Sequence, residues 1–154
     1  MALAYWRDDF KTHHPQIDSK HGEILNLLRR LYQDIMLNES GTAIQSSLDT
    51  LFVCLLDHAE AEEVLMRQYE YPEIRSHIDD HEVILSKMFN LRLGAESKDL
   101  KVTTEMVHGI AHSISVHNRT YDVSMIQYIQ RQDKSLPHVI HSDDFVDLDF
   151  DPMV

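Results

Sequence analysis

The stretch from His58 to His81 constrains the fold of this chain more than any other part of the sequence. It opens with His58 and Glu62 and closes with His77 and His81, and the members of each pair are four residues apart. Residues at this spacing share a face of an α-helix, so each pair presents two metal-binding groups in one direction. Pro72 stands between the pairs, and proline often begins a new helix. The stretch therefore predicts two helices that face each other across a bundle core and offer imidazole and carboxylate groups to a metal ion.

The composition favours helices along the whole chain. Gly and Pro occur only four times each in 154 residues, whereas the helix-favouring residues Leu, Met, Glu and Gln are plentiful. A chain of this length usually forms a single domain with a sizeable core. We therefore expect an all-α protein.

Apolar residues recur at steps of three and four and predict four helices. Asp18 or Ser19 is expected to cap the first helix, and Gly94 to end the third. Residues 1–16 show no clear period and are expected to form an N-terminal arm. Short loops predict an up-down-up-down four-helix bundle within residues 1–132, followed by an acidic C-terminal tail at 133–154. The expected helices span about residues 18–37, 42–69, 72–93 and 100–132.

Histidines and carboxylates interrupt the apolar face of every predicted helix. His21 lies on the inward face of the first helix, and His117 and Asp122 lie within the fourth. Their spacing of five residues places His117 and Asp122 about 140° apart on a regular α-helix. Both can reach one centre only if the helix widens locally into a π-type turn or if a side chain has a long reach. The candidate metal ligands are His21, His58, Glu62, His77, His81, His117 and Asp122.

Each candidate also has an ordinary structural interpretation. A single buried histidine is more often a hydrogen-bonded core residue than a ligand, and pairs such as His108 and His112 arise by chance in a chain with 11 histidines. Their occurrence together changes the balance, because each buried polar group without a partner costs several kcal/mol. Five imidazoles and two bridging carboxylates suit a pair of metals such as iron, with an oxo or hydroxo bridge and one open position. Zinc more often takes four ligands in a closed tetrahedron.

The sequence resembles the hemerythrin family in its bacterial branch. The resemblance covers about residues 6–130 and rests on Trp6 and on the segments IDSKH (17–21), HAEAEEVLM (58–66), YPEIRSHIDDH (71–81) and HNRTYD (117–122).

This resemblance implies a non-haem centre of two iron ions in a four-helix bundle. It assigns His77, His81 and His117 to one iron, and His21 and His58 to a second iron that keeps an open site. Glu62 and Asp122 would bridge the two. In the family, dioxygen binds reversibly to the diferrous form and is held as a hydroperoxide. The resemblance therefore implies an oxygen-binding protein, with oxygen transport among its uses.

The residues expected around the oxygen site depart from the family pattern. Ala59, Ser113 and Asn118 stand where the family commonly has larger or more apolar side chains, while Leu55 and Ile114 are expected to keep part of the pocket apolar. A roomier and wetter pocket favours autoxidation, peroxide chemistry, or binding of other small ligands such as nitric oxide or azide.

The net charge and the targeting signals of the sequence limit the binding partners and the cellular location that we expect for this protein. A formal net charge of −12 argues against binding to nucleic acids or anionic membranes, which need basic surfaces. The single cysteine, Cys54, excludes a disulfide within one chain. No apolar run approaches the roughly 20 residues of a transmembrane helix, and the N-terminal sequence lacks the apolar core of a secretion signal. We expect a cytoplasmic protein.

Three functions are compatible with these features. The leading hypothesis is a non-enzymatic di-iron protein that binds dioxygen for storage, delivery or scavenging. The second is an oxygen, redox or nitric oxide sensor that signals to a protein partner through the tail at 133–154. The third is a di-iron enzyme that acts on peroxide or nitric oxide, which the small and polar residues at 59, 113 and 118 favour.

Overall fold

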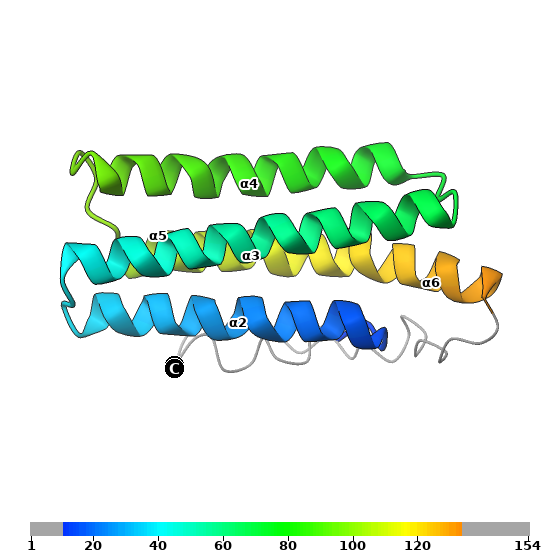
Figure 1. Cartoon of the computed structure of the whole chain (residues 1–154), viewed down its shortest axis with the longest axis horizontal. Helices are drawn as coiled ribbons and strands as arrows, with labels where there is room; N and C mark the ends of the chain where they lie inside the picture. The colour runs from blue at the N-terminus through cyan, green and yellow to red at the C-terminus, as the bar shows by residue number, and fades with distance from the viewer. Residues whose placement is uncertain (1–10, 134–154) are drawn as a thin grey trace.

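The computed structural model describes residues 11–133, which form helices and no strand. Three long helices are followed by a fourth that runs continuously through a π-helical segment. Figure 1 shows the four side by side along a common axis, so the predicted all-α four-helix bundle is confirmed. The elements are α2 (Pro15–Met36), α3 (Gly41–Gln68), α4 (Ile74–Glu96), α5 (Thr104–His117), η1 (Asn118–Asp122) and α6 (Val123–Gln132).

The bundle core consists of two apolar clusters with a polar layer between them. The larger cluster includes Ile24, Leu55, Ile84 and Ile114, one residue from each helix of the bundle. The smaller cluster lies toward the other end of the bundle and consists of Ile17, Met66, Tyr71, Met125, Ile126 and Ile129.

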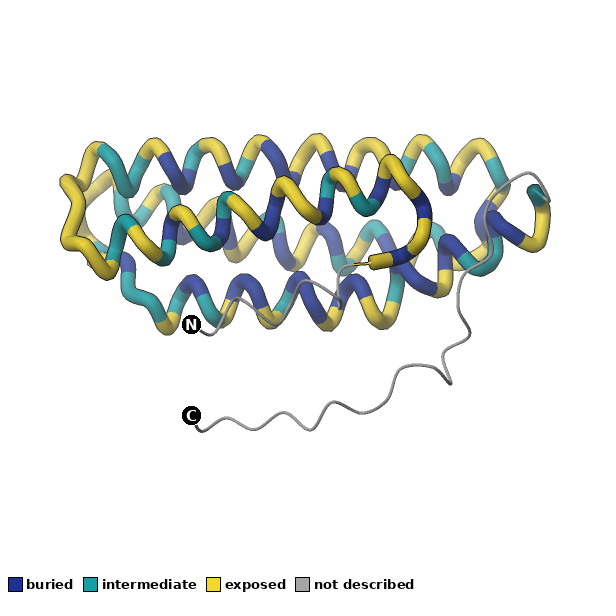
Figure 2. The backbone as a smooth tube through the Cα atoms, turned by 90° about the horizontal axis from the view of Figure 1, so that it is seen from below, coloured by how far each residue is buried: buried dark blue, intermediate teal, exposed yellow. Residues whose placement is uncertain are grey.

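On every helix the candidate ligands fall between residues of these two clusters. On α2, for example, His21 follows Ile17 of the smaller cluster and precedes Ile24 of the larger one. Figure 2 shows the buried positions recurring along the inner side of each helix. The periodicity that buries the apolar residues therefore also buries the histidines and carboxylates.

The first helix begins earlier than the sequence pattern predicts. Pro15 occupies its first turn, where proline is favoured because the missing N–H needs no partner there. The prediction that Asp18 or Ser19 caps this helix is wrong. The Asp18 carboxylate instead accepts hydrogen bonds from the backbone N–H groups of Thr12, at 2.6 Å, and His13, at 3.0 Å. Asp18 thus fastens the preceding segment to the helix.

The third helix does not end at Gly94 but continues to Glu96. Gly94 serves a different purpose, since a Cβ added there would lie 3.0 Å from the Cβ of Leu100. The absence of a side chain allows the loop to cross close to the helix. The chain turns at Lys98, whose φ is 61°. The last helix then begins at Thr104, later than predicted, after Thr103 caps it by accepting a hydrogen bond from Met106 N–H.

The last helix ends at Gln132, and the predicted division of the chain at residue 132 stays a prediction. Asp133 accepts a hydrogen bond from the Tyr69 hydroxyl at 2.9 Å. The acidic tail from 134 onward and residues 1–10 of the predicted arm lie outside the described residues. None of the helices within 11–133 combines the length and apolar character that a bilayer crossing requires.

Candidate metal centre

All seven predicted ligands meet in the polar layer of the bundle. Each is buried, with at most 5% of its surface exposed, and both carboxylates are essentially inaccessible to solvent. The side chains come from every helix of the bundle, so the centre exists only in the folded chain. Their names are His21, His58, Glu62, His77, His81, His117 and Asp122.

The π-helical segment brings His117 and Asp122 to the same place. It covers Asn118–Asp122, and the N–H of Val123 bonds to the carbonyl of Asn118, five residues back. This wider turn removes the angular offset that a regular helix would give a pair of residues five apart. The predicted local widening of the helix is confirmed, and the Nε2 of His117 lies 2.9 Å from the Asp122 carboxylate.

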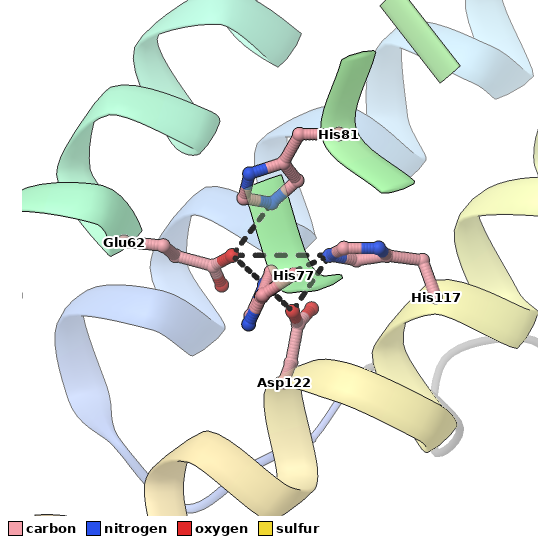
Figure 3. A group of neighbouring side chains, drawn as sticks. All are labelled: Glu62, His77, His81, His117 and Asp122. Atoms are coloured by element: carbon pink, nitrogen blue, oxygen red, sulfur yellow. Dashed lines mark hydrogen bonds and ion pairs between the residues drawn. The ribbon is translucent and has the colours of Figure 1, made fainter. Parts of the chain in front are cut away.

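The imidazoles of a first group of ligand atoms come from α4 and the fourth helix (Figure 3). This group combines His77, His81 and His117 with one oxygen each from Glu62 and Asp122. The Nε2 atoms of His77 and His81 lie 3.1 Å and 3.0 Å from Oε2 of Glu62. The Nε2 of His77 is also 3.1 Å from the Nε2 of His117 and 3.1 Å from Oδ1 of Asp122.

The imidazoles of a second group of ligand atoms come from α2 and α3. This group contains the two imidazoles of His21 and His58 with the same two carboxylates. The Nε2 of His21 lies 3.1 Å from Oδ2 of Asp122 and 3.9 Å from Oε1 of Glu62. The Nε2 of His58 lies 3.4 Å from Oε1 of Glu62.

Each carboxylate therefore offers one oxygen to each group. Glu62 presents Oε2 to the three-imidazole group and Oε1 to the two-imidazole group. Asp122 presents Oδ1 to the first and Oδ2 to the second. This is the arrangement of two carboxylates that bridge a pair of adjacent cations.

The spacing of the first group fits a single ion. Two ligand atoms at right angles, about 2.1 Å from one metal ion, lie about 3.0 Å apart, and two on opposite sides lie about 4.2 Å apart. The short separations around His77 match the first value. The 4.0 Å between Nε2 of His117 and Oε2 of Glu62 approaches the second.

The hydrogen bonding of these groups also fits a bound cation. The two oxygens of Asp122 and Oε1 of Glu62 accept no hydrogen bond of good geometry, although imidazole nitrogens lie close to them. Buried carboxylate oxygens without partners are costly, and coordination of a cation would satisfy them together. The residues present therefore suit a metal centre.

A family comparison agrees with this geometry. The family model described as the hemerythrin HHE cation binding domain matches residues 12–128. The chain belongs to the hemerythrin family. The match includes all seven ligand candidates, so the centre described above lies in the cation-binding part of this hemerythrin domain.

Curated relatives point to the bacterial branch of the family. A bacteriohemerythrin of Stenotrophomonas maltophilia (strain R551-3) and one of Pseudomonas aeruginosa (strain LESB58) are each 29% identical to the chain over 93 residues. Each alignment covers 60% of this chain and 60% of the relative. No solved structure matches the chain significantly.

The electrostatics of the hemerythrin centre favour a cation. Burial lowers the pKa of His58 to about 4 despite the opposing effect of Glu62, so this imidazole is neutral and its lone pair is available at pH 7. Burial also disfavours the charged form of His117, but Asp122 and Glu62 outweigh it and raise its pKa to about 11. Burial and Asp122 act to raise the pKa of Glu62, yet the surrounding imidazoles hold it below its usual range. Two carboxylates that stay ionised in a buried layer attract positive charge.

Asp80 orients one of the ligands and was not predicted from the sequence. Its carboxylate accepts a hydrogen bond from Nδ1 of His117 at 2.7 Å. Because an ionised carboxylate can only accept, Nδ1 of His117 keeps its proton, and Nε2 is the nitrogen that would bind a metal ion in exchange for the second proton that the raised pKa favours. The sequence position of Asp80 could have suggested this role, because Asp80 stands three residues after His77 and adjoins the helical face that carries His77.

Only some of the residues predicted to line the oxygen pocket are buried close to the candidate ligands. Leu55, Ala59, Ile114 and Asn118 are buried, and Leu55 and Ile114 belong to the larger apolar cluster next to the site. The hydroxyl of Ser113 instead accepts a hydrogen bond from Lys87 at 3.1 Å and donates to the carbonyl of Gly109. Ser113 thus lies in the seam between α4 and α5, and its role at the pocket stays a prediction.

A groove on the outer surface is separate from the metal centre. It encloses about 630 Å³ between the outer sides of α2 and α3, and residues such as Lys20, Ala61 and Val64 line it. None of the seven ligand candidates contributes to its walls. The chemistry of this chain is therefore expected in the buried layer.

Proposed function

We propose that this hemerythrin domain holds two iron ions and binds dioxygen reversibly, as a binding protein without enzymatic turnover. The observation that carries the proposal is the division of each bridging carboxylate between two groups of imidazoles. One oxygen of Glu62 and one of Asp122 face the three-imidazole group, and the other oxygens face His21 and His58. Two adjacent cations are the occupants that use all four oxygens.

The donor set supports iron. The three-imidazole group offers five donor atoms, which exceeds the four that zinc usually takes in a closed site. A mixture of imidazole and carboxylate donors inside a four-helix bundle is typical of non-haem iron centres. The printed name of the relatives, bacteriohemerythrin, is in keeping with this proposal.

The unequal groups support small-ligand binding on one side. Around His21 and His58 only four donor atoms are available, so an ion there keeps room for an external ligand. Two iron ions supply the electrons with which dioxygen is bound reversibly. The protein holds the imidazoles at fixed positions and excludes water with the apolar residues Ile24, Leu55 and Ile114.

The decisive experiment combines metal analysis with optical spectroscopy. The chain is loaded anaerobically with ferrous ions, washed, analysed for iron and exposed to oxygen. We expect about two irons per chain and a visible charge-transfer band that persists for minutes and disappears under argon. Immediate and irreversible oxidation would contradict reversible binding, and a content of one metal ion would contradict the paired centre.

The same preparation tests the enzymatic alternative. Turnover of peroxide or nitric oxide is measured against an equal concentration of free ferrous ion. We expect no excess turnover by the protein. A clear excess would replace the binding proposal with a catalytic one.

A further inference from the structure

Tyr121 makes an aromatic contact with the three-imidazole group. It stands directly before Asp122 in the π-helical segment η1. Its ring is stacked at 27° on the ring of His117, with centroids 5.3 Å apart. The same ring lies 5.6 Å from the ring of His77 at an angle of 45°. One tyrosine therefore contacts two of the imidazoles that converge on the first cation position.

Tyr121 also links this group to the surface. His77 and His117 are almost completely buried, whereas Tyr121 is only half-buried. In the two-imidazole group, the described ring contacts of His21 and His58 are to other imidazoles. Within the described part of the chain, Tyr121 is thus the aromatic side chain that joins solvent to a ligand imidazole.

Two exposed valines lie in the seam between α4 and the fourth helix, which also contains His117. Two hydrogen bonds, from His117 to Asp80 and from Lys87 to Ser113, set the register of α4 against the fourth helix. On α4, Val83 lies between Asp80 and Lys87. On α5, Val116 lies between Ser113 and His117. Val83 is 50% exposed and Val116 is 40% exposed. The seam thus combines these exposed valines with the charged groups of Asp80 and Lys87.

We propose that Tyr121 is the contact through which a small one-electron donor reduces the metal centre. The proposal rests on the proposed function, because it assumes redox-active iron. In each step the donor loses one electron and one ferric ion becomes ferrous, so two steps return the diferric centre to the diferrous form. The ring of Tyr121 acts with His117 as a tunnelling bridge. The ring is not itself oxidised.

The physical reason is distance and contact. Electron tunnelling weakens steeply as the separation grows and is stronger through touching π systems than across gaps. All seven ligands are buried, so a donor at the surface cannot touch them. Through Tyr121 the path from solvent to the first cation position consists of one phenol ring and one imidazole ring.

The test compares Tyr121→Leu and Tyr121→Phe with the wild-type chain. Each protein is loaded with iron, oxidised to the diferric form, and mixed anaerobically with excess reduced methyl viologen while the ferric absorption is followed. We expect Tyr121→Leu to be reduced about tenfold more slowly and Tyr121→Phe at nearly the wild-type rate. Tyr32→Leu is the matched control, because Tyr32 makes a similar ring contact with His108, which is not a ligand candidate. It should leave the rate unchanged.

Several results would overturn the proposal. If Tyr121→Leu is reduced as fast as wild type, or faster, the ring only shields the site. If Tyr121→Phe is as slow as Tyr121→Leu, the hydroxyl and not the ring is responsible. Iron content and the spectrum with azide are measured first. Wild-type protein without two irons would contradict the proposed function itself, independently of the role of Tyr121. Should Tyr121→Leu lose iron, Tyr121→Met replaces it, and iron loss in both would show that the ring merely holds the ligands.

Discussion

The two imidazole groups of the centre share the same carboxylates but differ in how completely they are built. Around His77, His81 and His117, five donor atoms converge, Asp80 holds one imidazole in place, and Tyr121 covers two of the rings. Around His21 and His58 there are four donors. The comparison shows that the two groups would hold cations unequally, with five donor atoms in one and four in the other.

The difference between the two groups originates in the number of imidazoles that each helix supplies. Helix α4 supplies two imidazoles from successive turns of one face, and the fourth helix adds a third. Helices α2 and α3 supply one imidazole each to the other group. The position of the histidines along the four helices thus decides how many imidazoles each group would offer to a cation.

Loss of a shared carboxylate should have the largest effect, since it abolishes both groups. Glu62→Ala removes an oxygen from each side and leaves the imidazoles without their common partner. We expect almost complete loss of iron, measured by elemental analysis after loading. Glu60→Ala, at an exposed position on the same helix, is the control and should keep its iron. Retention of both irons by Glu62→Ala would contradict the bridging role.

Two single substitutions, one in each imidazole group, directly test the difference between the groups. His77→Ala should lose most of the metal, because His77 lies next to three other ligand atoms of the three-imidazole group. His58→Ala should retain about one ion per chain, in the intact three-imidazole group. His112→Ala, at an exposed histidine, should bind iron like the wild type. Equal losses in the two ligand variants would show that the groups are not distinct.

A smaller effect is expected from Asp80→Asn, which weakens the hold on His117. Hydrogen-bond partners of ligand imidazoles typically change metal affinity by about 10- to 100-fold. We expect a loss at the lower end of this range at the three-imidazole group, measured by competition with a chelator. Asp79→Asn alters the adjacent carboxylate, which pairs with Arg75 on the surface, and should have no effect. An unchanged affinity in Asp80→Asn would mean that packing alone orients His117.

The smallest effect concerns the pocket beside the open group. Ala59 is buried next to His58, and leucine there would exclude water at the risk of crowding the core. We expect Ala59→Leu to slow autoxidation about twofold to fivefold, followed by the decay of the oxygenated spectrum. Ala61→Leu adds the same side chain at an exposed site of the same helix and serves as the control. Faster autoxidation in Ala59→Leu would place the ligand pocket elsewhere.

Much of this centre was predictable because helical periodicity links spacing to direction. The pairs His58–Glu62 and His77–His81 face inward as their spacing requires. The five-residue step from His117 to Asp122 predicted either a π-type widening or a long side-chain reach, and the structure has the widening. Local capping was less predictable, because Asp18 had two possible sets of backbone partners and binds the segment that precedes the helix. Gly94 was misinterpreted because its importance lies in a contact with Leu100, which periodicity does not reveal.

The side chains that support the ligands were harder to find. Asp80 and Tyr121 act through residues on a neighbouring element or turn, and their spacing places them near ligand positions without showing which contacts they make. Their roles depend on how α4 is registered against the fourth helix, which only the packed bundle determines.

The polar layer between the two apolar clusters has a consequence for the lifetime of the protein. Because this layer crosses all four helices, the bundle resembles two short hydrophobic bundles whose junction is completed by metal. A ligand that binds only the folded state stabilises it in proportion to the logarithm of its concentration over its dissociation constant. Chains that have not acquired metal would open first at this junction and be degraded first. The fold would thereby couple the abundance of the protein to the supply of iron.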